Sequence, residues 1–228
     1  MPNELRNGLV GLALLATGLA WSGGAAAAIF NFNNNGVITI PGTGTRGPAV
    51  PFPSVISVTG ITAVTDVDVT LLGLSHTFSR DLEIVLEGPT GLRVALLVDA
   101  GDNAVWTDDD VTFSDGSPAV TPSSPGNSGT FAPTGPGGAC GVTLAAPLPQ
   151  CAGAGSLLSV FNAVIPSGDW KLYINDDDNL DAGNLGRGWR LTFNATIVES
   201  STAIPEPITL AILGVGLAGL GWLRRVTV

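Results

Sequence analysis

Basic residues are scarce in this chain of 228 residues, and they do not cluster. Nine Lys and Arg residues stand against 19 Asp and Glu residues, which gives a formal net charge of −10. Away from the two ends of the chain, the basic residues are Arg46, Arg80, Arg93, Lys171, Arg187 and Arg190. Nucleic-acid binding requires concentrated Lys and Arg to neutralise phosphates. The composition therefore argues against a nucleic-acid partner.

Histidine is limited to one residue, His76. A Ser-His-Asp triad would have to use His76 as its base, yet no Gly-x-Ser-x-Gly or Gly-Thr-Ser segment supplies the nucleophile. Glu83 and Glu87 recur on one strand face, a pattern that glycosidase carboxylates share with any solvated surface, and we interpret them as solvated. We predict that His76 is structural, that no residue is catalytic and that the chain is not an enzyme.

Charged residues make up only 12% of the chain, whereas glycine (31) and proline (16) are abundant. This balance disfavours long helices held by charge pairs and favours short strands joined by turns. Alternation of apolar and polar residues predicts about eight or nine strands, each with one buried face. The predicted strands include 37–40, 55–58, 64–71, 82–87, 94–97, 111–113, 170–175 and 189–197. The predicted fold is an all-β sandwich of two sheets.

Two apolar segments flank the predicted β domain, residues 29–199. Residues 1–28 combine a weakly basic start, a short apolar run and an Ala-rich end, which is typical of a secretory signal peptide. The alternative is a spanning helix, although the run is shorter than the roughly 20 residues that a bilayer requires. Residues 200–228 contain a polar linker, an apolar run predicted to be a transmembrane helix, and a basic end on the cytoplasmic side. Within the domain, residues 116–155 form a long insert rich in Ser, Pro and Gly.

Cysteine is limited to two residues, Cys140 and Cys151, both in the insert. In an exported chain an even pair predicts a disulfide bond. A metal-binding pair or free thiols are the alternatives, and no further Cys or nearby His completes a metal-ligand set.

Aspartates gather in two predicted loops, and we predict that they could bind a metal. Carboxylates are the hard oxygen donors that Ca²⁺ prefers. The EF-hand pattern is absent, because its required Gly and Glu are replaced by Ala182 and Gly188 when counted from Asp177. Solvated acidic turns are the alternative interpretation. The candidate calcium ligands are Asp99, Asp102, Asp176, Asp177, Asp178 and Asp181.

The C-terminal segment contains Pro205, Glu206 and Pro207, then an apolar run, and then the terminal Arg224 and Arg225. With these parts in this order, it resembles the PEP-CTERM sorting signal of Gram-negative bacteria. It implies an exosortase partner, an anchored intermediate in the inner membrane, cleavage near the tripeptide, and delivery to the cell surface or extracellular matrix. A plain C-terminal anchor is the alternative.

Four segments of the β domain form a recognisable set: Leu74-Ser75-His76-Thr77, Leu86-Glu87-Gly88-Pro89-Thr90-Gly91, Gly168-Asp169-Trp170-Lys171 and Gly186-Arg187-Gly188-Trp189. Through these segments, residues 55–197 resemble the P domain (P/Homo B) of kexin- and furin-like proprotein convertases. The resemblance implies a jelly-roll, galactose-binding-like sandwich without catalytic residues, from which the insert 116–155 departs. Together with the predicted signal peptide and PEP-CTERM segment, the resemblance predicts a non-catalytic surface or matrix protein that contacts polysaccharide or protein. The alternative is a detached accessory domain of a subtilisin-like serine endopeptidase.

Overall fold

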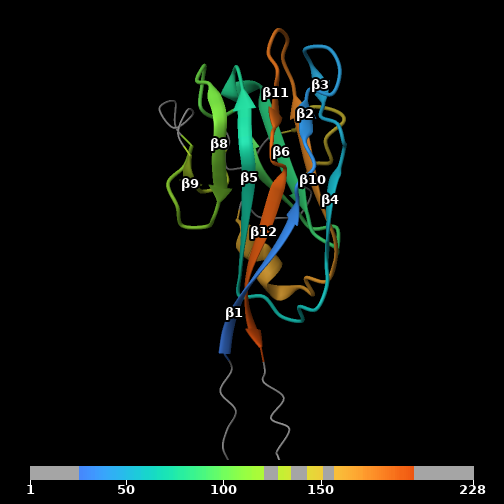
Figure 1. The fold of residues 1–228 in the computed structure, drawn as a ribbon, viewed down its shortest axis with the longest axis vertical. Coiled ribbons are helices and arrows are strands. Elements are labelled where there is room, and N and C mark those ends of the chain that lie inside the picture. The colour runs from blue at the N-terminus through green and yellow to red at the C-terminus, as the bar shows by residue number, and fades with distance from the viewer. Residues whose placement is uncertain (1–25, 121–127, 135–142, 151–156, 198–228) are drawn as a thin grey trace, which may run out of the picture. The chain divides into compact units, whose positions relative to one another are not determined.

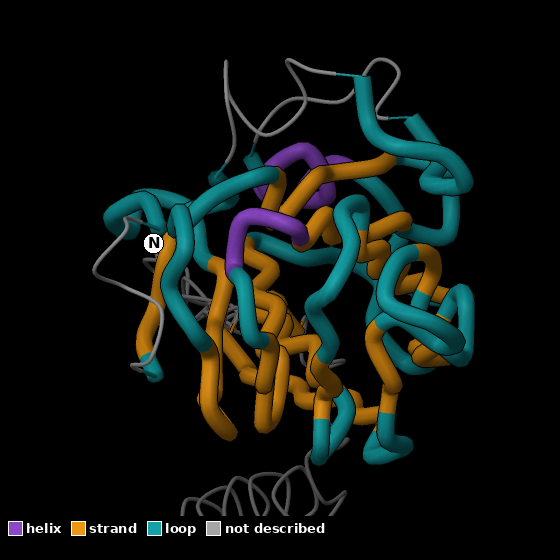
Figure 2. Tube along the Cα trace, turned by 90° about the horizontal axis from the view of Figure 1, so that it is seen from above, coloured by secondary structure: helices purple, strands orange, loops and turns teal. Residues whose placement is uncertain are grey.

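Two β-sheets surround a shared core in a computed structural model of the chain (Figure 1). The structure describes residues 26–120, 128–134, 143–150 and 157–197. Strands and the loops that connect them make up most of the β domain, and the helical segments are short (Figure 2). The prediction of an all-β fold with two sheets is confirmed, whereas the jelly-roll class stays a prediction.

Twelve strands occur in the described residues, more than the eight or nine predicted. Sheet A contains β1 (Ala26–Asn34), β2 (Ile38–Ile40), β5 (Asp66–His76), β8 (Trp106–Phe113), β9 (Gly129–Phe131), β11 (Gly183–Leu185) and β12 (Trp189–Ile197). Sheet B contains β3 (Gly47–Pro48), β4 (Ser54–Val58), β6 (Leu82–Glu87), β7 (Arg93–Val98) and β10 (Gly168–Asp176). Two short 3-10 helices complete the described elements, η1 (Ser79–Asp81) and η2 (Leu158–Ala163).

The strand order brings the ends of distant segments together. Sheet A runs β1-β12-β5-β11-β2, with β8 on the other edge of β5 and β9 parallel to β8. Sheet B runs β3-β10-β6-β7, with β4 also paired to β10. The sequence analysis missed four strands, β1, β3, β9 and β11. The strand β11 lies between the predicted strands 170–175 and 189–197. The central position of β6, antiparallel to both β7 and β10, later determines where the acidic loops meet.

Period-two burial defines the shared core as the alternation predicts. In β5, Val67, Val69 and Leu71 are buried, while Asp66 and Thr70 are only partly buried. Each fully buried tryptophan of the core uses its indole N–H, which removes the cost of burying an unpaired donor. The acceptors are Ser79 Oγ for Trp106, Pro166 O for Trp170 and Ser54 Oγ for Trp189.

A second, smaller core covers the outer face of sheet B. Val85, Ala95 and Val98 project from β6 and β7 and pack with Leu144 and Leu148. We call residues 143–150 the covering segment. All six residues of β6 are consequently buried, so the prediction that Glu83 and Glu87 face solvent is wrong.

Several predicted features lie outside the described residues. These are both cysteines, the tripeptide at 205–207, the terminal arginines, and the signal segment except for Ala26–Ala28, which belong to β1. Within the described ranges, no helix is long and apolar enough to cross a membrane.

Candidate metal centre

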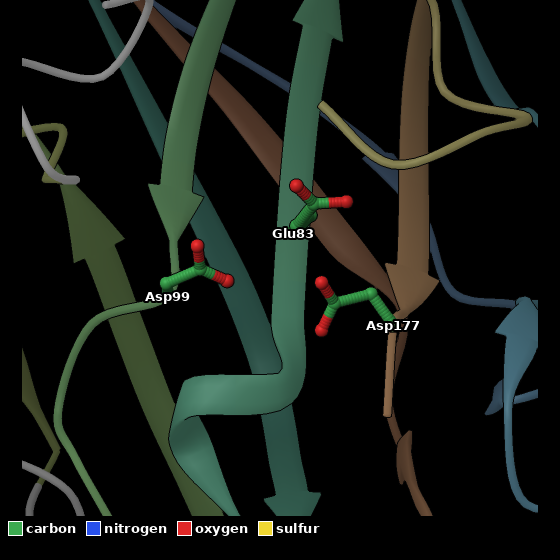
Figure 3. A group of neighbouring side chains, drawn as sticks. All are labelled: Glu83, Asp99 and Asp177. Atoms are coloured by element: carbon green, nitrogen blue, oxygen red, sulfur yellow. The ribbon is translucent and has the colours of Figure 1, made fainter. Parts of the chain in front are cut away.

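Three carboxylates converge at one end of the outer face of sheet B (Figure 3). Glu83 lies in β6, Asp99 directly follows β7, and Asp177 directly follows β10. One oxygen from each lies within 4.8 Å of the other two. Glu83 is buried, and the two aspartates are partly buried. A single small cation could contact all three side chains.

Strand register explains why these residues meet. Glu83 is paired with Val98 of β7 on one side and with Asn175 of β10 on the other. Because both neighbours run antiparallel to β6, their C-terminal ends lie beside its beginning. Backbone hydrogen bonds hold both departing loops, from Asp99 N–H to Leu82 O at 3.3 Å and from Asp177 N–H to Asp81 O at 2.9 Å.

Burial and mutual repulsion raise the pKa of Glu83 to about 7. Burial is the largest cause, and the nearby Asp177 and Asp99 raise the pKa further. Two hydrogen bonds oppose the increase, one from Ala145 N–H in the covering segment and one from the side chain of Asn175. Ala145 N lies 2.9 and 3.1 Å from the two carboxylate oxygens of Glu83. The site therefore brings three acidic side chains together in surroundings that are buried at Glu83 and partly buried at the two aspartates.

The pKa values of the two aspartates, Asp99 and Asp177, are also raised. Burial raises the pKa of Asp99, and the positive charge of Arg80 opposes this increase. Burial also raises the pKa of Asp177, as does Asp99, and Arg46 acts in the opposite direction. Among the described residues, none of the three carboxylates has a salt bridge.

Glu87, on the same face of β6, provides a direct contrast. Its carboxylate lies 2.6 Å from Arg93 Nε and 2.8 Å from Lys171 Nζ. Burial alone would raise the pKa of Glu87, but the hydrogen bonds from Lys171 and Arg93 outweigh burial and lower it. A buried glutamate on this face is thus neutralised by cations in one case and surrounded by further acids in the other.

Asn175 adds an unsatisfied acceptor beside the acidic group. The residue is only 1% exposed, and its Oδ1 has no hydrogen-bond partner in the described part of the chain. Asn175 is the cross-strand partner of Glu83, and Asp177 follows two positions along the same chain segment. A buried carbonyl oxygen without a donor is uncommon and indicates a missing partner.

The structure brings only two of the six predicted metal ligands together, namely Asp99 and Asp177. Asp176 is buried and contacts His76 Nε2 at 3.1 Å, while Asp181 Oδ1 accepts a hydrogen bond from Thr77 Oγ1 at 2.7 Å. Asp102 and Asp178 are exposed. The two members that the sequence analysis missed are Glu83 and Asn175. Val85 could have indicated that Glu83 is buried, because it is an apolar residue on the same face of the strand.

His76 is held inside the domain by both ring nitrogens. Its side chain is 0% exposed, with Nδ1 2.8 Å from Phe78 O and Nε2 3.1 Å from Asp176 Oδ2. Burial is the main cause that raises the pKa of Asp176, and the contact with His76 opposes it. This geometry agrees with the predicted structural role of His76.

The C-terminal segment places the chain in a class of exported proteins. The family comparison matches the PEP-CTERM protein-sorting motif at residues 203–225, a range that includes the tripeptide and both terminal arginines. The chain therefore carries the signal of a protein that an exosortase processes and that is exported to the envelope or surface of a Gram-negative bacterium. The comparison with curated proteins gives no match. The resemblance of residues 55–197 to the P domain accordingly stays a prediction.

Proposed function

We propose that this chain is a surface or extracellular-matrix protein whose β domain is a non-catalytic module that contacts polysaccharide or protein partners. The observation that carries the proposal is the PEP-CTERM motif at residues 203–225. In the sequence, the matched motif begins at residue 203, six positions after the end of β12 at Ile197. Processing near the tripeptide would leave the β domain at the surface.

The environment of His76 supports the non-catalytic part of the proposal. The chain has no other histidine. The side chain of His76 is 0% exposed and both ring nitrogens lie within hydrogen-bond distance of atoms inside the domain, which gives no surface on which His76 could meet a substrate. The alternative proposal is a detached accessory domain that stabilises a subtilisin-like serine endopeptidase, as the resemblance to P domains implies.

Cell fractionation tests this function. The full chain and a Pro205→Ala, Glu206→Ala, Pro207→Ala variant would be produced in a Gram-negative host that has an exosortase. Glu199→Ala, which changes an acidic residue outside the matched range, is the control. We expect the native chain and the control at the cell surface, and the triple variant in the inner membrane with its tail intact.

Two outcomes would count against the proposal. Identical distribution of all three chains would show that the tripeptide does not direct sorting. Hydrolysis of peptides or polysaccharides by the purified chain would contradict a non-catalytic role.

A further inference from the structure

We propose that Glu83, Asp99 and Asp177 bind one Ca²⁺ ion on the outer face of sheet B, with Asn175 Oδ1 as a fourth protein ligand. The site goes beyond the proposed surface role and does not depend on it. The ligands lie in or directly after three neighbouring strands, β7, β6 and β10.

The spacing of the oxygens suits calcium. Ca²⁺–oxygen distances are about 2.3–2.6 Å, so two oxygens on one ion are separated by at most about 5 Å. The three carboxylate oxygens lie within 4.8 Å of one another. Mg²⁺ requires near-ideal octahedral geometry at about 2.0–2.1 Å, a tighter arrangement. The donors are all oxygens, as expected for a hard cation rather than for zinc or copper.

Asn175 provides the observation that is independent of the acidic cluster. Its Oδ1 is buried and has no hydrogen-bond donor in the described part of the chain. Because Asn175 is paired with Glu83, the two side chains project from the same face of the sheet. The Cβ atoms of such a pair are about 5 Å apart. Side-chain amide oxygens are regular calcium ligands. A cation beside Glu83 would complete the coordination that Asn175 lacks.

Charge balance along β6 points the same way. Glu87 has two basic partners at 2.6 and 2.8 Å. Glu83, equally buried, faces Asp99 and Asp177 and has no basic side chain in salt-bridge contact among the described residues. Uncompensated buried charges are strongly unfavourable. A divalent cation would supply the compensating positive charge at Glu83 that Lys171 and Arg93 supply at Glu87.

The site would also fix the covering segment. Ala145 N–H donates to both oxygens of Glu83, so a cation that orders Glu83 also orders residue 145. Leu144, next to Ala145, belongs to the second core. Calcium would thereby link the ends of three strands to the segment that covers their outer face.

Calcium titration of the purified full chain in mild detergent, after chelation, tests the site. We expect one Ca²⁺ per chain, a Kd of about 10⁻⁴–10⁻³ M, the range of extracellular modules, and a higher Tm with Ca²⁺. Asp99→Asn and Asp177→Asn should each weaken Ca²⁺ binding about tenfold or more, because fewer charged ligands remain. Asp178→Asn is the matched control, since Asp178 is exposed in the same loop and lies outside the group.

Asn175→Asp separates a ligand from a merely structural residue. The added carboxylate should lower the Tm without calcium, by repulsion, and strengthen Ca²⁺ binding at the same time. Unchanged calcium affinity in this variant would overturn the role of Asn175.

The native chain provides a test that does not depend on how the variants fold. The proposed site is wrong if about 10 mM Ca²⁺, a concentration above the largest usual Kd, produces neither heat of binding in calorimetry nor a change in Tm. An equal loss of binding in Asp178→Asn would overturn the assignment of ligands, and tighter binding of Mg²⁺ would overturn the choice of ion.

Discussion

Leu148→Ala tests whether the covering segment packs against sheet B. Leu148 is 5% exposed and shares the second core with Val85, Ala95 and Val98. Truncation of a buried leucine costs about 2–5 kcal/mol, and less where the surroundings can collapse into the cavity. The covering segment is short and lies at the periphery, so we expect a loss of about 2–3 kcal/mol in the free energy of unfolding.

Urea unfolding followed by tryptophan fluorescence measures this loss. The expected change corresponds to a decrease in Tm of about 4–12 °C for a domain of this size. The control is Ile165→Ala, because Ile165 is 67% exposed and should change stability by less than about 0.5 kcal/mol. If Leu148→Ala has as little effect as Ile165→Ala, the covering segment does not bury the outer face, and the burial of Glu83 is refuted with it.

Two further predictions concern β11 and β6. Gly183→Ala should destabilise the domain by about 3 kcal/mol, because the added Cβ would overlap the backbone oxygen of Ser75. Gly186→Ala is the control and should be nearly neutral, because a Cβ at this position meets only ordinary contacts. Thermal melts of the two variants measure the difference. Equal melts for the two variants would contradict this packing. The pKa of Glu87 in the folded chain lies below the usual 4.5. The ionised Glu87 carboxylate therefore stabilises the folded state fully above pH 4.5, and this stabilisation is lost as the pH falls through the folded-state pKa. Glu87→Gln should therefore lower stability at pH 7 but have a smaller effect near pH 3, and a difference that stays constant with pH would refute the reasoning.

The strands were predictable where the alternation is regular and one face is open. The residues of β5, β10 and β12 alternate in this way, and all three strands were found. The buried outer face of β6 was not predictable, because period-two alternation shows which residues share a face and not what covers that face. The cover comes from residues 143–150, whose Pro- and Ala-rich composition has no periodicity.

The candidate site was predictable only in part for the same reason. Asp99 and Asp177 were predicted as metal ligands because they lie in acidic loops. Glu83 lies inside a strand and becomes a candidate ligand only when the register places it between the ends of β7 and β10. Asn175 requires the three-dimensional structure, since an unsatisfied oxygen cannot be recognised from sequence.

The intact mass of the protein recovered from the cell surface tests the central claim most directly. If the chain is exported and processed by an exosortase at its PEP-CTERM motif, the surface protein will contain the β domain and lack the apolar and basic residues that follow Pro205-Glu206-Pro207. Recovery of the protein only from the cytoplasm, or at the surface with the mass of an uncleaved C-terminus, would contradict the account.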